Sequence, residues 1–371
     1  MAATGTSYPM NGGNGLHSYT NNSKFQRGPA DAIKQMTNTA IVDNNVSFAS
    51  NNTTTIRVGD MGCSVGPNTF LSLQNILQSL RCKMANDSIE YQVFLNDHTS
   101  NDFNTLFAQS VPHQDSYYVA GVPGSFHGRL FPAASLHVVH SSYALQWLSR
   151  VPNSVLDCNS PAWNKGEICY CSGATGGGKE ESIVGAYKEQ FGMDLGCFLN
   201  ARASEVVGGG LMLVVIPGRS NETSHSKVTS NVTYSLLGSC LMDMAHKGLI
   251  SEGKVDSLNI PIYFASPEEV EAAVEANGSF GIVTMECIKQ GRGPGTAESK
   301  ARAISAHIRA GMEELLKLHF GDDGDGDRQT VFPMDELFRS YEHKLLTCGF
   351  FQGDNSGEAF TLFAALKRKH Q

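Results

Sequence analysis

The strongest constraint on the fold is a series of seven short apolar runs, rich in β-branched residues, that recur along the chain. Each run has the length and composition of a buried strand. The segments between the early runs have helical spacing instead, as in Phe70–Leu80, and Leu145–Leu148 continues a fourth such unit. Alternating strands and helices require parallel crossovers, so the sequence predicts an α/β fold with one large sheet. The seven runs are Ile56–Asp60, Tyr91–Asn96, Tyr117–Gly121, Leu136–His140, Leu211–Ile216, Phe280–Cys287 and Phe360–Leu366.

The composition is that of an ordinary globular protein. The 371 residues suffice for one large α/β domain with an elaboration, or for roughly two and a half domains. Hydrophobic residues make up 41% and charged residues 17%, which excludes a disordered, collagen-like or coiled-coil protein. A formal net charge of −8, without a basic stripe interleaved with aromatic residues, argues against nucleic acid as a partner.

The sequence also argues against a membrane partner. No apolar run approaches the roughly 20 residues that a membrane-spanning helix needs, and residues 1–15 are polar and glycine-rich. We therefore expect a cytoplasmic protein. The nine cysteines are odd in number and widely spaced, and Cys169 and Cys171 lack the spacing of a zinc or redox pair. Free thiols are expected.

Two interruptions of the strand rhythm predict insertions that cover a pocket at one edge of the sheet: Val151–Ser182 and Ser220–Asn277. A third helical stretch, Ala297–Phe320, ends in the acidic residues 321–327; we interpret these as a solvated loop, because the glutamate expected at position twelve of a calcium loop is absent. The expected organisation is 1–150, the N-terminal substrate and cofactor segment with the first half of the core; 151–181, a cap insertion; 182–219, core; 220–277, a helical cap; 278–290, core; 291–350, a cap or helical segment; and 351–371, the last core strand.

A strand, a glycine turn and a helix follow one another around residues 60–68, which read DMGCSVGPN. Doubly wound folds bind a nucleoside cofactor with this arrangement, because glycine lets the backbone approach the ligand. The Gly-x-x-x-Gly spacing is weakly specific, and Asp60 adds the decisive information. A carboxylate in the turn repels a diphosphate and attracts an ammonium or sulfonium group. The segment therefore favours S-adenosylmethionine over NAD.

The ends of the next two strands carry further candidate cofactor contacts. Asp97 ends the second strand, where a carboxylate accepts hydrogen bonds from ribose hydroxyls; the alternative is that it caps the helix before residues 101–103. After the third strand, Ser125 is placed to reach adenine and Phe126 to cover it. A plain turn with a core phenylalanine is the alternative there.

Several of these motifs, taken together over nearly the whole chain, resemble the plant SABATH methyltransferases. The resemblance implies a Rossmann-like seven-stranded methyltransferase sheet with a mainly helical cap. It also implies transfer of a methyl group from S-adenosylmethionine to the carboxyl group of a small plant acid, or to a xanthine nitrogen in a subset of members. The motifs are NGG at 11–13, SY at 18–19, NS at 22–23, Gln26, DMGCS at 60–64, FLND at 94–97, GVPGSF at 121–126, HSSYALQWLS at 140–149, NIP at 259–261 and NGSF at 277–280.

The resemblance also implies roles for individual residues. The residues expected around S-adenosylmethionine are Tyr19, Ser23, Asp60, Gly62, Asn68, Asp97, His98, Ser125 and Phe126. Gln26 and Trp147 would bind the acceptor carboxylate through amide and indole N–H donors, which suit an anion. Tyr143, one helical turn before Trp147, would share its face, with Gln146 and Tyr234 completing the acceptor site. No acid or base catalyst is implied.

Departures from the family pattern leave the acceptor open. Asn11 replaces a common lysine, and Gln146 stands where salicylate-type members often have methionine but purine methylators often have glutamine. A small aromatic acid of the salicylate, benzoate or cinnamate type is the leading interpretation. Indole-acetate, jasmonate, a xanthine, or an acid sensor without turnover are the alternatives.

The resemblance implies two further partners. Some relatives bind Mg²⁺ through residues at the positions of Asp256 and Asn259, together with an asparagine in the first insertion. Residues 170–174, where this asparagine is expected, contain none. Family members similar to this chain form homodimers, so a homodimer is expected.

Overall fold

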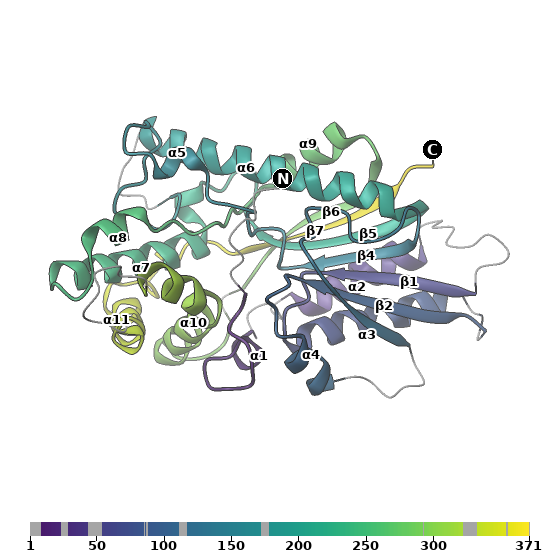
Figure 1. Ribbon diagram of the computed structural model, residues 1–371, viewed down its shortest axis with the longest axis horizontal. Helices are drawn as coiled ribbons and strands as arrows, with labels where there is room; N and C mark the ends of the chain where they lie inside the picture. Colours follow the sequence, from purple (N-terminus) through teal and green to yellow (C-terminus); the bar gives the residue numbers. More distant parts are fainter. Residues whose placement is uncertain are drawn as a thin grey trace.

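A seven-stranded mixed sheet forms the centre of the protein, as the sequence predicted (Figure 1). The computed structural model describes residues 9–23, 29–43, 54–84, 86, 88–110, 117–171, 178–291, 293–321, 332–353 and 355–370. The strand order is β3-β2-β1-β4-β5-β7-β6, in which β7 runs antiparallel to both of its neighbours and the other neighbouring pairs are parallel. The strands are β1 Thr55–Met61, β2 Glu90–Asp97, β3 Tyr118–Pro123, β4 Leu136–Ser142, β5 Val206–Gly218, β6 Phe280–Lys289 and β7 Phe360–Arg368.

The largest difference from the predicted strands is the start of β5, at Val206 rather than Leu211. Glycines at 208–210 hide this part of the strand from a sequence pattern, because glycine is rare in strand interiors. The register of β4 and β5 shifts between Leu136 and Val138, and a Cβ atom at Gly210 would lie 2.9 Å from the carbonyl oxygen of His137. The glycines therefore permit a close approach of the two backbones.

Helices cover both faces of the sheet. In Figure 1, α6 and α9 lie on one face, and α2, α3 and α4 lie on the other. The helices are α1 Tyr19–Asn22, α2 Ala30–Val42, α3 Pro67–Met84, α4 Phe103–Ser110, α5 Asn153–Leu156, α6 Gly178–Glu205, the 3₁₀ helix η2 His225–Lys227, α7 Thr229–His246, α8 Glu252–Ser257, α9 Pro267–Asn277, α10 Ala297–Phe320 and α11 Met334–Thr347.

The two faces of the sheet have separate hydrophobic cores. Within Leu211–Ile216 of β5, the even-numbered side chains pack with α6 and the odd-numbered ones pack with α3. This alternation follows from the two-residue period of a strand. A central strand that is buried on both faces reads as a continuous apolar run, which is why the sequence revealed it.

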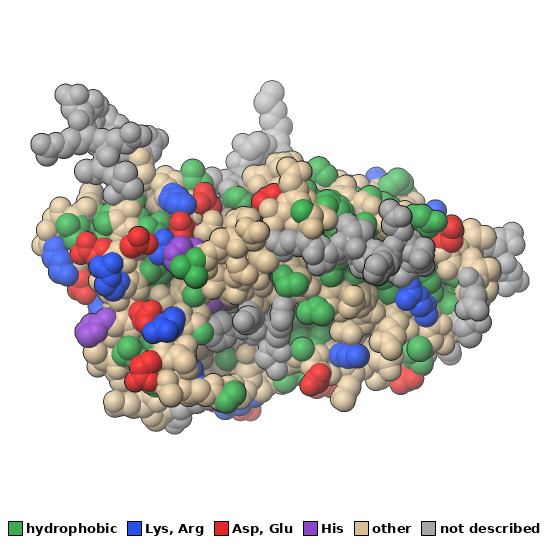
Figure 2. All heavy atoms as spheres, turned by 90° about the horizontal axis from the view of Figure 1, so that it is seen from below, with side chains coloured by type: hydrophobic (Ala, Val, Ile, Leu, Met, Phe, Trp, Pro, Cys, Tyr) green, Lys and Arg blue, Asp and Glu red, His purple; other side chains and the backbone are tan. Residues whose placement is uncertain are grey.

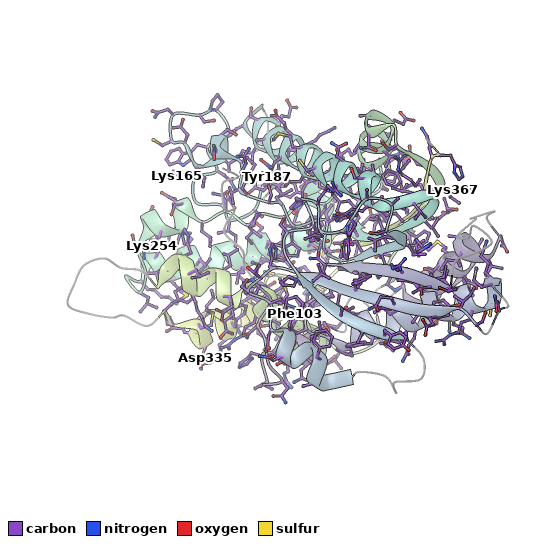
Figure 3. All side chains as sticks on the ribbon, turned by 45° about the vertical axis from the view of Figure 1, so that its right-hand side comes forward. Phe103, Lys165, Tyr187, Lys254, Asp335 and Lys367 are labelled. Carbon is purple, nitrogen blue, oxygen red and sulfur yellow. The ribbon has the colours of Figure 1, made fainter. Side chains whose placement is uncertain are left out.

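A second group of helices, α7, α8, α10 and α11, lies beyond one end of the sheet (Figure 1). The fully buried Tyr341 of α11 donates a hydrogen bond from its hydroxyl to the carbonyl oxygen of Thr233 on α7, over 3.1 Å. Tyr187 of α6, labelled in Figure 3, donates to the carbonyl oxygen of Ile260 over 3.2 Å. Figure 2 shows acidic and basic side chains intermixed at this end of the molecule. Among the described residues, no helix is long and apolar enough to cross a membrane.

The buried His137 makes the stability of the sheet depend on pH. Its Nδ1 accepts a hydrogen bond from the backbone N–H of Arg57 over 3.1 Å, and burial together with the Arg57 charge lowers its pKa to about 4. Between pH 6.5 and 4 the unfolded chain binds more protons at this histidine, so the free energy of unfolding falls as the pH falls, by up to about 3 kcal/mol. We expect His137→Asn, which cannot titrate, to reduce this acid sensitivity in thermal unfolding.

The exposed His246 provides the matched control, since His246→Asn should leave the pH dependence unchanged. His225, whose pKa burial also lowers to about 4, keeps part of the acid sensitivity in both variants. Equal acid sensitivity in His137→Asn and the unmodified protein would contradict the assignment.

Candidate active site

A large cavity of about 2600 Å³ opens between the carboxyl ends of the parallel strands and the helical group. This volume exceeds the roughly 300–1,000 Å³ of an ordinary ligand pocket, which leaves room for a nucleoside cofactor and an acceptor together. Of the predicted site residues, the following line the cavity: Tyr19, Asp60, Gly62, Asn68, Asp97, His98, Ser125, Phe126, Tyr143, Gln146, Trp147 and Tyr234. Gln26 lies outside the described residues.

Asp60 lies at the carboxyl end of β1, opposite His140 of β4 in the sheet register. The Asp60 Oδ1 and His140 Nδ1 atoms are 2.7 Å apart, and both side chains are buried. Sequence reasoning placed Asp60 in the site but missed its bond to His140. The signal was present, because both residues end adjacent parallel strands and such ends meet at one edge of the sheet.

The glycine turn after β1 is held by the end of β2. The backbone N–H groups of Gly62 and Cys63 both donate to the carbonyl oxygen of Asn96, each over 2.9 Å, and the N–H of Ser64 donates to Asp97 Oδ2 over 2.7 Å. Gly62 has a φ of 82°, which glycine adopts without strain. A phosphate-binding loop would present such backbone amides to a ligand, but here they already donate to oxygen atoms of the protein itself.

Asp97 holds its own loop as well as facing the cavity. Its second oxygen, Oδ1, accepts from the N–H of His98 over 2.7 Å. Burial raises the pKa of Asp97 and the nearby Asp60 charge adds to this, while the bonds from Ser64 and His98 oppose it. The helix-cap alternative is wrong, because Asp102 caps α4 instead, accepting from the N–H of Thr105 over 2.9 Å.

The segment after β3 carries Ser125 and Phe126 into the cavity wall. Phe126 packs edge-on against Phe198 of α6, with ring centroids 6.0 Å apart. The side-chain amide of the fully buried Asn96 donates to the carbonyl oxygens of Val122 and Gly124 over 2.7 and 2.8 Å. Sequence reasoning treated Asn96 only as a neighbour of Asp97 and missed that it joins the two loops.

The N-terminal segment lies against the helix that follows the glycine turn. Asn68 donates to the carbonyl oxygen and to Oγ of Ser23 over 3.0 and 3.1 Å. Ser23 itself is buried and does not belong to the cavity lining. The side-chain amide of Asn11 donates to the carbonyl oxygen of His17, and its backbone N–H donates to the carbonyl oxygen of Ala310, each over 2.9 Å. Asn11 therefore ties this segment to α10.

Tyr143 and Trp147 line the same cavity but do not share a helical face, so the predicted helix around Leu145–Leu148 is wrong. Tyr143 directly follows β4 and has a φ of 54°, and Trp147 forms an isolated antiparallel bridge with Ile262. A residue with a positive, left-handed φ interrupts a regular helix or strand. The bridge then pairs the backbone of Trp147 with an extended segment. The Tyr143 hydroxyl shares a 3.1 Å hydrogen bond with Thr361 Oγ1. Burial raises the pKa of the Tyr143 hydroxyl.

Gln146 leaves one acceptor without a partner. Its Nε2 donates to the carbonyl oxygen of Tyr143 over 2.7 Å, which fixes the orientation of the amide because a carbonyl accepts only from the NH₂ group. Gln146 Oε1 is buried and has no hydrogen-bond partner in the part of the chain that the structure describes. An unmet buried acceptor in a cavity wall favours a ligand that carries a hydrogen-bond donor.

The residues expected around Mg²⁺ lie apart from the cavity lining. Asn164 lies beside Asn259, with its Nδ2 donating to Asn259 Oδ1 over 2.8 Å. Asp256 Oδ1 is buried and has no hydrogen-bond partner among the described residues. Carboxylate and amide oxygens fit Mg²⁺, so Asp256 and Asn259 are the residues that would hold the ion. Within the described ranges, no cluster of three or more His, Cys, Asp or Glu side chains suits a metal. The Mg²⁺ site stays a prediction.

The sheet, its antiparallel β7 and the cavity at the strand ends define an S-adenosylmethionine-dependent methyltransferase. A family model described as SAM dependent carboxyl methyltransferase matches residues 5–369. The chain therefore belongs to the SABATH family of carboxyl methyltransferases, which confirms the resemblance seen in the sequence.

Individual relatives agree with this assignment. Loganic acid O-methyltransferase of Catharanthus roseus is 39% identical over 370 residues, covering 98% of this chain and 94% of the relative. Salicylate carboxymethyltransferase of Clarkia breweri is 39% identical over 331 residues, covering 84% and 88%. A solved structure of loganic acid methyltransferase with SAH superposes with a TM-score of 0.87 at 38% identity, covering 98% of this chain and 99% of that one.

Gly62 is a sensitive position in the site, since an added Cβ would lie 2.3 Å from the Cβ of Ala144 and the φ is 82°. We expect Gly62→Ala to lower the free energy of unfolding by at least about 1–3 kcal/mol, from backbone strain and steric overlap. Gly192→Ala is the control: Gly192 lies within α6, and an added Cβ would have no side chain or neighbouring segment of the described chain within 4 Å, so alanine should stabilise the helix by about 0.5–1 kcal/mol. Denaturant unfolding distinguishes the opposite signs, and equal effects would contradict the geometry.

Proposed function

We propose that this protein transfers the methyl group of S-adenosylmethionine to the carboxylate of a small organic acid. The observation that carries the proposal is the juxtaposition, in one cavity, of two strand-end carboxylates, the buried Asp60 and the half-buried Asp97, and an aromatic, donor-bearing wall. Asp60 and Asp97 suit a cationic nucleoside, and Trp147 suits an anion. These groups come from β1, β2 and the segment after β4.

We assign the cofactor side as follows. Asp60 attracts the ammonium group, with Tyr19, Gly62 and Asn68 beside it and Ser23 behind Asn68. Asp97 accepts hydrogen bonds from the ribose hydroxyls, and His98 contacts the ribose. Ser125 and Phe126 contact adenine. The buried His140 holds the Asp60 carboxylate in one orientation through their 2.7 Å contact.

The chemistry needs alignment rather than proton transfer. S-Adenosylmethionine supplies a methyl group on a positively charged sulfur. An acid with a pKa near ~4 is already ionised near neutral pH, so the carboxylate needs no general base. Gln26 and the indole N–H of Trp147 hold the carboxylate, with Tyr143, Gln146 and Tyr234 around the rest of the acceptor. Fixing the reacting groups at about 3 Å is worth on the order of 7–11 kcal/mol.

The acceptor class follows from the unmet oxygen of Gln146. An acid with a hydroxyl group would donate to Oε1, whereas an acid without a donor would leave the oxygen desolvated and unpaired. We therefore propose a hydroxylated small acid, aromatic as in the salicylate type or alicyclic as the name of the loganic acid relative indicates. A xanthine N–H is the second candidate for the same oxygen. The cytoplasmic location, the homodimer and the domain limits remain predictions.

The role of Asp60 can be tested with two ligands. We expect Asp60→Asn, which keeps an oxygen for His140, to weaken binding of S-adenosyl-L-homocysteine about tenfold or more, because the ammonium loses its counter-charge. Binding of 5′-methylthioadenosine, which has no ammonium, should change little. Calorimetry measures both affinities. Equal weakening of the two ligands, or no effect on either, would argue that Asp60 has only a structural role.

The role of Trp147 can be tested against the only other tryptophan, Trp163, which lies outside the cavity lining. We expect Trp147→Phe to lower kcat/KM for the acid by about 10- to 100-fold, because the carboxylate loses a charge-assisted hydrogen bond. Binding of S-adenosyl-L-homocysteine to Trp147→Phe should stay intact. The kcat/KM of Trp163→Phe should be close to that of the unmodified protein.

A labelled-methyl assay over hydroxylated acids, matched acids without hydroxyls, and xanthines identifies the acceptor. Turnover of hydroxylated acids alone supports the proposal, and turnover of xanthines alone supports the second candidate. If the cofactor and acids bind but no methyl ester forms, the chain is an acid sensor.

A further inference from the structure

A buried ion pair ends helix α6, close to the site but outside the cavity lining. The Arg202 Nε atom donates to Glu205 Oε2 over 2.7 Å, and neither side chain is exposed to solvent. Burying two charges carries a desolvation cost that their attraction offsets only when further hydrogen bonds satisfy the remaining polar atoms. The partners of those atoms therefore indicate what the pair holds in place.

The remaining atoms of the pair bind one segment, residues 126–131. Arg202 donates from Nη1 to the carbonyl oxygen of Phe126 over 3.0 Å and from Nη2 to that of Gly128 over 2.8 Å. Glu205 Oε1 accepts from the N–H groups of Leu130 and Phe131 over 2.5 and 3.0 Å. The planar guanidinium and the carboxylate thus fix both the carbonyl and the amide groups of this segment.

Gly124, two residues before this segment, is held by β2. The N–H of Gly124 donates to the carbonyl oxygen of Asp97, and Asn96 Nδ2 donates to the carbonyl oxygen of Gly124, each over 2.8 Å. Between the two attachments, Ser125 and Phe126 lie in the cavity wall. The arginine also lies over the Phe198 ring, with Cζ 5.2 Å from its centroid, and Phe198 packs against Phe126.

We propose that Arg202 and Glu205 are positioning residues for the cofactor, which set the placement of Ser125 and Phe126 through the backbone of residues 126–131. The proposal rests on the proposed function only in naming S-adenosylmethionine as the ligand of that wall. The pair acts through the segment and touches no ligand itself.

Arg202→Lys tests the proposal, with Arg368→Lys as the matched control. Lysine keeps the charge but cannot reach both carbonyl oxygens and Glu205 in the planar arrangement of a guanidinium. Arg368 is also buried and donates to three carbonyl oxygens, those of Ala203, Ser279 and Lys369, but it contacts nothing in residues 124–131 in the hydrogen bonds of the described chain. Both substitutions therefore replace a buried arginine that donates to backbone carbonyl oxygens.

We expect Arg202→Lys to raise the Kd of S-adenosyl-L-homocysteine about tenfold or more, while the acceptor KM at saturating cofactor changes little. Amide exchange at Leu130 and Phe131 should also become faster in the ligand-free protein. Arg368→Lys should leave the Kd and these exchange rates unchanged, even if the Tm falls. If Arg202→Lys does not fold, Glu205→Gln, which keeps the side-chain volume, carries the same expectations.

Equal Kd values for the two arginine variants, or a change in acceptor KM without a change in Kd, would overturn the proposal. Failure of the unmodified protein to bind S-adenosyl-L-homocysteine would instead overturn the proposed function. The amide exchange of Leu130 and Phe131, which needs no ligand, would then decide the positioning role alone: unchanged exchange in Arg202→Lys would refute it.

Discussion

The rest of the site depends on the end of β2, where Asn96 and Asp97 satisfy the backbone of two loops at once. The Asn96 carbonyl oxygen and the Asp97 carboxylate accept from three successive amides of the turn after β1. The Asn96 side chain donates to the loop after β3. Buried backbone groups without partners cost about 1–3 kcal/mol each, so the two loops are stable only against this strand end. The predicted cofactor contacts at the ends of three strands thereby share one rigid support.

Charge is the second organising feature of the cavity. Asp60 is buried and Asp97 is half-buried; burial raises the pKa of Asp97, and the Asp60 charge adds to this. Backbone amides and His140 partly compensate for these carboxylates. A cationic ligand would complete the compensation, whereas a diphosphate would add to the repulsion. The same electrostatics that strain the unliganded site therefore select the class of cofactor.

The predicted acceptor side is built differently, because its residues depend on contacts with β7 and with the segment between α8 and α9. Trp147 pairs through its backbone with Ile262, and the Tyr143 hydroxyl bonds to Thr361 on β7. The backbone N–H of Tyr263 donates to the carbonyl oxygen of Gln146 over 2.9 Å. The predicted acceptor wall is thus connected to β7 and to the segment between α8 and α9, so changes in those parts of the chain can alter the acceptor without altering the predicted cofactor contacts. This division is consistent with one family whose members differ in acceptor.

The sequence by itself determined the seven strands, the α/β class, the family and the cofactor, because these depend on local periodicity and on residues close together in the chain. Asp60, Asp97, Ser125 and Phe126 could be predicted to lie together, since each is at or just after the carboxyl end of a strand and parallel strands end at one edge. Only the tertiary structure decided that His140 binds Asp60, that Asp102 rather than Asp97 caps α4, and that Asn164 joins Asn259. It also replaced the helix predicted at Leu145–Leu148 with an irregular segment and revealed the Arg202–Glu205 pair. These features join residues far apart in the sequence, or override local preference by long-range pairing, and no local pattern records such contacts.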